Sequence, residues 1–259
     1  MNRAIVVTGT DTGVGKTIFA TALANALGAH YWKPIQAGLA DGSDSEVVAS
    51  LGVIVLPEAY RLTTPCSPDR AAEIDGVAIN PDRLILSPSP LGVSGRPCPR
   101  HGLDSAGRCP PDTGLGWGLS ASDMARGEAP PPTPPLKGRG EKSDLPYLII
   151  EGAGGVLVPV TCDLLFADLF ARWGHPVVLV ARTTLGTINH SLMSIEALRA
   201  RGVPILGVAF TGDPVEHSEA TIARIGGVRR LGRLPHLQQL DAATLHAAFT
   251  THFNLADFA

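Results

Sequence analysis

Short apolar runs alternate with helical patterns along most of the chain. Continuous apolar runs are typical of buried parallel strands, and they occur at residues 4–7, 147–150, 177–180 and 205–210. Further strands are expected at residues 31–34, where a short strand ends in a lysine, and at residues 230–234. Helical periodicity is found at residues 18–27, 44–51, 163–173, 189–200, 218–225 and 241–253. Because strand and helix alternate in this way, the pattern predicts a doubly wound, mostly parallel α/β sheet.

Residues at the segment ends support these boundaries. Gly28 and Gly202 follow helical segments, where a glycine commonly ends a helix, and Ser43 precedes one, where its hydroxyl can cap the first turn. In doubly wound sheets, ligands bind at the carboxyl ends of the strands. Polar residues that follow the predicted strands are therefore candidates for function.

Residues 87–144 break the pattern. They contain 11 prolines and 10 glycines in 58 residues and show no sustained apolar period. Such a segment buries too little surface to offset the entropy of ordering, so we predict a disordered insertion within a single domain spanning residues 1–259. A proline-rich docking segment, or a metal site using Cys98, His101 and Cys109, is less favoured, because those three residues lack zinc-site spacing and a fourth ligand.

Composition narrows the class of protein further. Of the 259 residues, 44% are hydrophobic and 17% are charged, which supplies a core and argues against a solvated, disordered chain. The net charge of −3 gives no attraction to nucleic acid or to an anionic membrane. The first apolar run is too short for a signal peptide or a membrane span. We expect a cytoplasmic protein that acts on small molecules.

A glycine-rich loop separates the first predicted strand from the first predicted helix. Its sequence GTDTGVGKT, residues 9–17, approaches the Walker A pattern G-x₄-G-K-[ST], although the first glycine comes one residue early. Backbone N–H groups at a helix N-terminus attract a phosphate, and Gly13 and Gly15 allow the backbone to approach it closely. Lys16 can pair with the β and γ phosphates, and the Thr17 hydroxyl can bind Mg²⁺. The loop predicts a nucleoside triphosphate site.

Two carboxylates are candidate ligands for that metal ion. Glu151 directly follows a predicted central strand, and Gly152, Gly154 and Gly155 behind it indicate the close approach of a ligand. Asp44 begins a predicted helix. Since Mg²⁺ usually takes one or two carboxylates together with phosphate oxygens, this pair suits it.

Lys33 indicates a second anion beside the triphosphate. A lysine that follows a buried strand is costly unless an anion pairs with it. Two lysines directed at one site, Lys16 and Lys33, indicate more negative charge than a triphosphate brings. This favours a carboxylate or carbamate that becomes phosphorylated.

Taken together, the motifs resemble those of the dethiobiotin synthase family. The matching segments occur in the family's order: GTDTGVGKT (9–17), KPIQAG (33–38), SD (43–44), PCSP (65–68), EGAGGVLVP (151–159) and LGTINH (185–190). The resemblance covers about residues 3–84 and 146–259. It implies a P-loop NTPase fold, a homodimer with the active site at the interface, and an ATP-dependent cyclo-ligase. That enzyme class closes 7,8-diaminononanoate with CO₂ to dethiobiotin, using Mg²⁺ and ATP, in biotin synthesis.

The family's chemistry assigns roles to residues of this chain. One substrate amine captures CO₂ as a carbamate, which Lys33 would stabilise. The carbamate attacks the γ-phosphate held by Lys16, and the second amine then closes the resulting carbamic–phosphoric anhydride. The resemblance implies Thr17, Asp44 and Glu151 as the metal ligands, with catalysis dominated by positioning and charge neutralisation.

The resemblance also implies two sets of binding residues. The nucleotide would contact Thr12, Gly13, Val14, Gly15, Lys16, Thr17, Ile18, Asp44, Glu151, Gly152, Ala153, Gly154, Thr211, Gly212, Pro235, His236 and Leu237. The diamine would contact Lys33, Ala37, Gly155, Leu185, Gly186, Thr187 and Asn189. Of these, residues 185–189 resemble the part that reaches the partner subunit's site and binds the substrate carboxylate.

Three positions depart from the family's pattern. Asp69 follows Ser67 and Pro68, where members commonly have a histidine. Ala37 stands where members often have Ser or Thr, so one hydroxyl contact to substrate is missing. Thr211 stands where a base-binding Asn is common, so we expect Gly212 and residues 235–237 to contribute to nucleobase binding instead.

Three other interpretations remain open. A ParA/MinD-like ATPase switch would carry a second lysine early in the loop, where this chain has Asp11. The cobyrinic acid amidase group would need an added glutaminase domain, for which the sequence ending at Ala259 leaves no room. The third is a catalytically impaired paralogue, with the same fold and a broken dimer or pocket.

Overall fold

A computed structural model describes residues 4–40, 42–85 and 147–258 of the chain. The predicted insertion at residues 87–144, together with Cys98, His101 and Cys109, lies outside these residues. Among the described helices, none is both long and apolar enough to cross a membrane.

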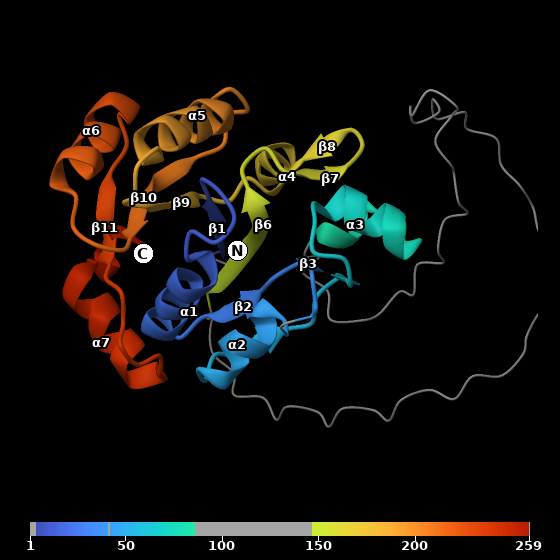
Figure 1. The fold of residues 1–259 in the computed structure, drawn as a ribbon, viewed down its shortest axis with the longest axis horizontal. Helices are drawn as coiled ribbons and strands as arrows, with labels where there is room; N and C mark the ends of the chain where they lie inside the picture. Colours follow the sequence, from blue (N-terminus) through green and yellow to red (C-terminus); the bar gives the residue numbers. More distant parts are fainter. Residues whose placement is uncertain (1–3, 41, 86–146, 259) are drawn as a thin grey trace, which may run out of the picture. The chain divides into compact units, whose positions relative to one another are not determined.

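A seven-stranded sheet carries the fold (Figure 1). Its strand order is β11-β10-β9-β1-β6-β2-β4, and each pair of neighbours is parallel. Its strands are β1 (Ala4–Gly9), β2 (His30–Trp32), β4 (Val55–Leu56), β6 (Leu148–Gly155), β9 (Val177–Arg182), β10 (Ile205–Thr211) and β11 (Arg230–Leu234). The prediction of a doubly wound parallel sheet is confirmed.

Helices cover both faces of the sheet. They are α1 (Lys16–Leu27), α2 (Asp44–Ser50), α3 (Pro68–Asp75), α4 (Phe166–Trp173), α5 (Thr187–Arg199), α6 (Glu216–Gly226) and α7 (Ala242–His252). Buried side chains of α1, α2 and α7 form one apolar cluster with the sheet, and those of α3, α4, α5 and α6 form another. The smaller elements are β3 (Ile35–Ala37) paired with β5 (Tyr60–Leu62), β7 (Pro159–Thr161) paired with β8 (Leu164–Leu165), and the 3₁₀ helices Pro81–Leu84 and Leu255–Asp257.

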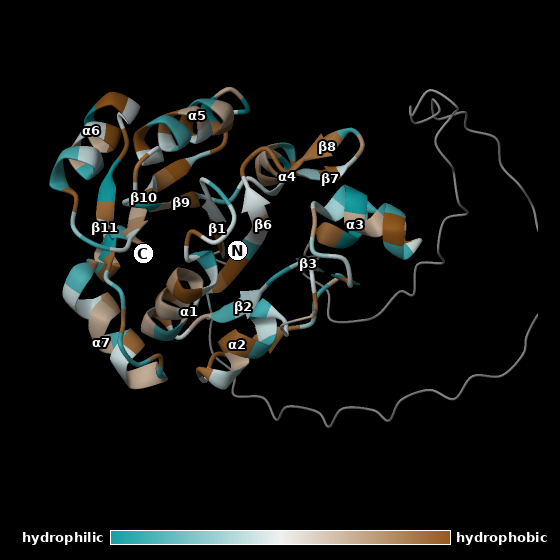
Figure 2. Ribbon diagram, viewed as in Figure 1, coloured by the Kyte–Doolittle hydropathy of each residue, from teal (hydrophilic) through white to brown (hydrophobic). Residues whose placement is uncertain are grey.

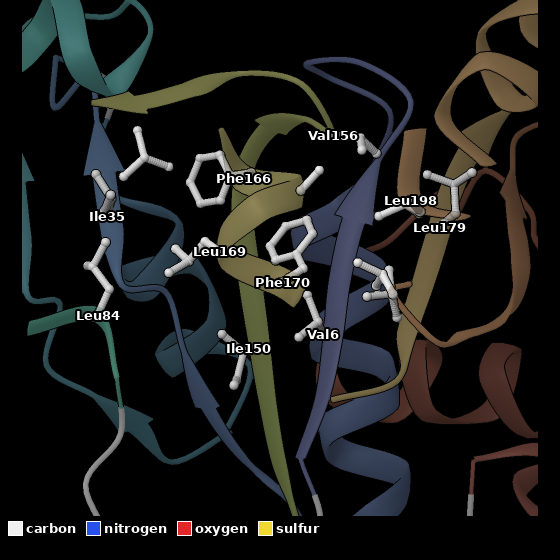
Figure 3. Close-up of a cluster of buried hydrophobic side chains, with 14 of the residues drawn as sticks. Val6, Ile35, Leu84, Ile150, Val156, Phe166, Leu169, Phe170, Leu179 and Leu198 are labelled. Carbon is white, nitrogen blue, oxygen red and sulfur yellow. The ribbon is translucent and has the colours of Figure 1, made fainter. Parts of the chain in front are cut away.

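The two clusters explain why the central strands are continuously apolar. In β1, Ala4 and Val6 belong to one cluster and Ile5 and Val7 to the other, because successive side chains of a strand point to opposite faces. Figure 3 shows the α4 side of the core, where Phe166, Leu169 and Phe170 pack with Val6 and Ile150. Each such side chain contributes about 1.5–3 kcal/mol when fully buried.

The apolar pattern of β6 stops toward the carboxyl end of the strand, which is the end at which such sheets bind ligands. Figure 2 shows hydrophobic residues along the first half of β6 and less hydrophobic ones toward its carboxyl end. Glu151 was expected just after this strand, but β6 continues through Gly155, so Glu151 lies inside it.

Several element boundaries differ from the sequence prediction. The helix expected from residue 163 begins at Phe166, because residues 164–165 pair with β7 and the Asp168 carboxylate accepts a hydrogen bond from the Leu165 N–H at 3.0 Å. The strand expected at residues 31–34 ends at Trp32, and α5 begins two residues before the predicted start. The helix α2 does follow Ser43, whose hydroxyl forms a capping box with Glu46.

Candidate active site

The phosphate loop joins β1 to α1. Gly13 and Gly15 have left-handed φ angles of 71° and 88°, and Gly15 is the N-cap of α1, where it adds no side-chain hydrogen bond to the first turn. The first-turn amides therefore remain available to an anion. Lys16 is buried, and its Nζ donates to the Asp11 carbonyl at 2.8 Å, so the lysine lies back over the loop.

The strand register places Lys33 opposite Glu151. In the pairing of β2 with β6, Trp32 lies beside Ile150, so the next residue along each strand brings these two side chains together. Lys33 Nζ is 3.2 Å from Glu151 Oε1, and it also forms an ion pair with Asp44. Glu151 Oε1 accepts a further hydrogen bond from Thr17 Oγ1 at 3.0 Å. The four residues predicted around the metal and the second anion are thus brought together.

Lys33 and Glu151 are almost entirely out of water, whereas the Asp44 side chain is 34% exposed. Glu151 is 1% exposed and Lys33 is 5% exposed. Burial alone lowers the pKa of Lys33, but the charges of Glu151 and Asp44 outweigh it and raise this pKa above its ordinary value. Burial lowers the pKa of Lys16, with Glu151 opposing it. The carboxylates of Glu151 and Asp44 therefore favour the protonated, positively charged form of Lys33.

Tyr31 contacts the Glu151 carboxylate and Gln36 contacts the Asp44 backbone, and neither residue was predicted from the sequence. Tyr31 Oη donates to Glu151 Oε2 at 2.9 Å, and Gln36 Oε1 accepts from the Asp44 N–H at 3.2 Å. Burial, and then the charge of Glu151, raise the pKa of Tyr31, so its hydroxyl remains protonated. The available signal was strand alternation, because Tyr31 lies two residues before Lys33 and therefore on the same face of the chain.

The donor set fits Mg²⁺. Thr17 Oγ1 contacts Glu151 Oε1, and Lys33 Nζ contacts both carboxylates, so oxygens of Thr17, Asp44 and Glu151 converge at the end of the phosphate loop. Hydroxyl and carboxylate oxygens are ligands that Mg²⁺ prefers. Within the described residues, no group of three or more His, Cys, Asp and Glu side chains could hold a metal ion. The arrangement suits an ion shared with nucleotide phosphates.

Two cavities share the phosphate loop. The first, here called the charged cavity, has a volume of about 680 Å³ and contains Lys16, Lys33, Asp44 and Glu151. Other predicted residues that line it are Thr12, Gly13, Gly15, Thr17, Ile18, Ala37, Ala153 and Gly154. Its remaining wall includes Val47, Val158 and the segment of residues 65–68.

The second, here called the side cavity, has a volume of about 590 Å³. Predicted nucleotide residues that line it are Gly13, Val14, Gly15, Ile18, Thr211, Gly212, Pro235, His236 and Leu237. Thr211 Oγ1 donates to the Val14 carbonyl at 2.7 Å, so this hydroxyl is engaged by the phosphate loop. The sequence analysis did not identify Arg182, which lines the same cavity and pairs with Asp11 at 3.0 Å.

Gly152 and Gly155 line neither cavity. A Cβ atom at Gly152 would lie 2.9 Å from the ring of Phe170, so this glycine permits close packing of β6 against α4. At Gly155 the nearest atoms would be the carbonyl oxygens of Thr10 and Gly9, at 3.4 and 3.6 Å, which is ordinary van der Waals contact. Packing within the chain therefore accounts for the glycine at position 152 but does not require one at position 155.

The segment of residues 185–189 also lies outside both cavities. It forms the N-terminal end of α5, where Gly186 has a φ of 94°, Leu185 is fully exposed and Asn189 is exposed. Thr187 is buried, and its hydroxyl has no hydrogen-bond partner. Within one chain, the predicted carboxylate-binding residues thus remain separate from the charged cavity.

Two comparisons with known proteins concern the domain as a whole. A family model described as an AAA domain matches residues 3–94 and 139–244. A solved structure of a ParA family ATPase from Chlorobium tepidum aligns over 96% of this chain and 91% of its own, with a TM-score of 0.46 and 11% identity.

Three curated relatives carry the name ATP-dependent dethiobiotin synthetase BioD. The protein of Novosphingobium aromaticivorans is 52% identical over 260 residues, which span 99% of each chain. That of Rhizorhabdus wittichii is 51% identical over 263 residues and 100% of each chain, and that of Sphingopyxis alaskensis is 51% identical over 254 residues and 98% of each chain. With half of its residues shared over the whole length, and with the phosphate loop assembled as described, this chain belongs to the ATP-dependent dethiobiotin synthetase family.

Proposed function

We propose that this chain converts 7,8-diaminononanoate, CO₂ and ATP to dethiobiotin, ADP and phosphate, with Mg²⁺, as a cytoplasmic homodimer. The observation that carries the proposal is the charged cavity, in which a buried, doubly paired Lys33 lies beside a phosphate loop. Family membership supplies the reaction, and the cavity supplies a place for a second anion next to a triphosphate.

The phosphate loop and the two lysines have separate roles in the proposed reaction. The loop amides and Lys16 hold the β and γ phosphates of ATP. One amine of the diamine adds to CO₂ and forms a carbamate, which lies against the ammonium group of Lys33. A carbamate oxygen attacks the γ-phosphorus and displaces ADP, and the second amine then attacks the carbamoyl carbon and displaces phosphate.

Thr17, Asp44 and Glu151 would hold Mg²⁺, and the bound ion would neutralise the charge of the phosphate oxygens during transfer. The protein itself mainly positions and neutralises charges, because neither attack requires a strong protein base once the amines are neutral. The apolar part of the cavity wall, Ala37, Val47, Pro65 and Val158, suits the aliphatic chain of the diamine.

The dimer explains the separate position of the segment of residues 185–189. Leu185 and, at 56% exposure, Met193 present apolar side chains on or beside α5. We propose that a second copy covers this end of α5 and receives the side chain of Asn189 in its own charged cavity, where Asn189 contacts the substrate carboxylate. Sedimentation of the purified chain as a monomer at micromolar concentration would contradict this arrangement.

The direct test is product formation by the purified full chain. Dethiobiotin, detected by mass spectrometry, and phosphate release should both require the diamine, bicarbonate, Mg²⁺ and ATP, each omitted in turn. Lys33→Ala should abolish product while nucleotide binding persists. Arg70→Ala, which removes only an exposed ion pair to Glu73, is the control and should leave the rate unchanged.

Other outcomes identify the alternatives. Phosphate release without the diamine would favour a ParA/MinD-like switch. Nucleotide binding without any turnover, in a folded protein, would favour a catalytically impaired paralogue.

A further inference from the structure

Tyr31 and Glu151 form a buried pair that no motif of the phosphate site includes. Tyr31 is fully buried on β2, and Glu151 lies on the neighbouring strand β6. The register pairs Tyr31 with Ile149, which places Glu151 two residues further along on the same face. The tyrosine ring can therefore reach toward the carboxyl end of the sheet, and its Oη donates to Glu151 Oε2 at 2.9 Å.

The two carboxylate oxygens of Glu151 have separate partners. Oε2 is bonded to Tyr31 in the interior of the protein. Oε1 accepts from Thr17 at 3.0 Å and lies 3.2 Å from Lys33 Nζ, so it is the oxygen that faces the phosphate loop. The terminal torsion of a glutamate side chain is broad, so the carboxylate plane is free to rotate unless both oxygens are bonded.

We propose that Tyr31 is a positioning residue that presents Glu151 to the metal ion through one oxygen only. The proposal rests on the proposed function, since it requires Glu151 to be a metal ligand. The tyrosine fixes the carboxylate plane, keeps Oε2 from the metal, and leaves Oε1 directed toward Thr17 and the phosphates. Phenylalanine would pack equally well here, so the hydroxyl is explained by this bond to a carboxylate that water cannot reach.

Groups that orient a metal ligand typically change metal affinity by about 10- to 100-fold when they are removed. Tyr31→Phe should therefore weaken metal binding in the nucleotide complex within that range, while nucleotide binding without metal stays the same. In a protein that already carries Glu151→Gln, Tyr31→Phe should weaken metal binding little further, because the tyrosine acts through Glu151.

The experiment uses Mn²⁺ as the probe and ADP as the nucleotide. The electron paramagnetic resonance signal of free Mn²⁺ gives its affinity for the ADP-bound full chain, and calorimetry in a chelator gives the affinity for ADP alone. Tyr60→Phe is the matched control, because Tyr60 is also buried and its Oη accepts a hydrogen bond, from the Asn80 N–H at 2.8 Å. A merely structural role for both hydroxyls would alter stability in both variants and Mn²⁺ affinity in neither.

Three results would overturn the proposal. Tyr31→Phe binds Mn²⁺ as tightly as Tyr60→Phe does, or Tyr31→Phe still weakens Mn²⁺ binding by its full factor when Glu151→Gln is already present, or Glu151→Gln binds Mn²⁺ like the unchanged protein. Neither the diamine nor CO₂ is present, so failure to form dethiobiotin would reject the proposed function without affecting these results.

A measurement on the unchanged protein covers the case in which Tyr31→Phe does not fold. Adding Mg²⁺ to the ADP complex should perturb the ultraviolet absorption of a buried tyrosine, because a cation on Glu151 withdraws charge from the carboxylate that Tyr31 contacts. The difference band should persist in Tyr60→Phe. Its absence from the unchanged protein would contradict the proposal.

Discussion

The charged cavity and the side cavity share one loop but are built in different ways. The charged cavity contains a buried ion pair, with Lys33 and Glu151 in direct contact. The side cavity is lined mostly by glycine, threonine and apolar residues, its charged residues Arg182 and Asp213 are exposed, and its Thr211 is engaged by the loop. Where the chain buries charges, the chemistry is specified by those charges, whereas the walls of the side cavity are mainly uncharged.

This difference can be tested by breaking the charged network. Lys33→Met retains the volume but leaves the Glu151 carboxylate buried without its cation. Removing one partner of a buried pair costs about 3–5 kcal/mol, so we expect a loss of that size in the free energy of unfolding, measured with urea. Added Mg²⁺ should restore part of it, because the ion binds the folded state. Arg70→Met, which removes an exposed ion pair to Glu73, should cost less than about 1 kcal/mol; equal losses would contradict the comparison.

The carboxylate can also be neutralised directly. Glu151→Gln keeps the shape of the side chain but removes the charge that a metal ion requires. We expect the Mg²⁺ concentration for half-maximal activity to rise by at least about tenfold, with little change in the affinity for metal-free nucleotide. An unchanged Mg²⁺ requirement would exclude Glu151 as a ligand.

The two lysines should differ in their response to alkaline pH. Burial lowers the pKa of Lys16, and the carboxylates raise the pKa of Lys33. A lysine is charged below its pKa, so Lys16 should lose its proton first as the pH rises. kcat/KM for ATP reports the free enzyme, so it should fall about tenfold per pH unit above the pKa of Lys16. Lys16→Arg should move this decline to higher pH; a decline that stays in place would assign it to another group.

The smallest effect is expected in the side cavity. Thr211→Val removes the hydroxyl that bonds to the Val14 carbonyl, a loss of about 1 kcal/mol, or roughly fivefold in affinity. Because that hydroxyl contacts the loop, ATP, GTP and CTP should weaken alike in a competition assay. A loss confined to ATP would show that Thr211 contacts the base.

The sequence predicted those parts of the molecule whose causes are local. Apolar runs located β1, β6, β9 and β10, and Ser43 located the start of α2. The edge strand β11 also matches the predicted residues 230–234. The short strands β3, β4 and β5 were missed, because two or three residues carry no measurable period.

Within the site, too, residues with a local signal in the sequence were predicted, and residues defined by distant contacts were not. Lys33 and Glu151 were identifiable because a charge beside a buried strand is unusual in itself. Tyr31 was not, because an aromatic residue in a strand is ordinary, and its partner lies 120 residues away in the sequence. The packing role of Gly152 also became apparent only in three dimensions, where the ring of Phe170 fills the adjacent space.

The position of Glu151 inside β6 has a consequence for motion. The strand pairs with β1 through Glu151 and with β2 through Ile150, so the backbone of this residue is held within the centre of the sheet. The backbone of such a segment becomes exposed to solvent only when the whole sheet unfolds. Exposed helix ends such as residues 185–189 unfold locally at a small cost in free energy. Hydrogen exchange at Glu151 should therefore be among the slowest in the chain. The part of the site that contains Glu151 is therefore expected to be rigid before any ligand binds. Any change of conformation on ligand binding should occur in the loops around it.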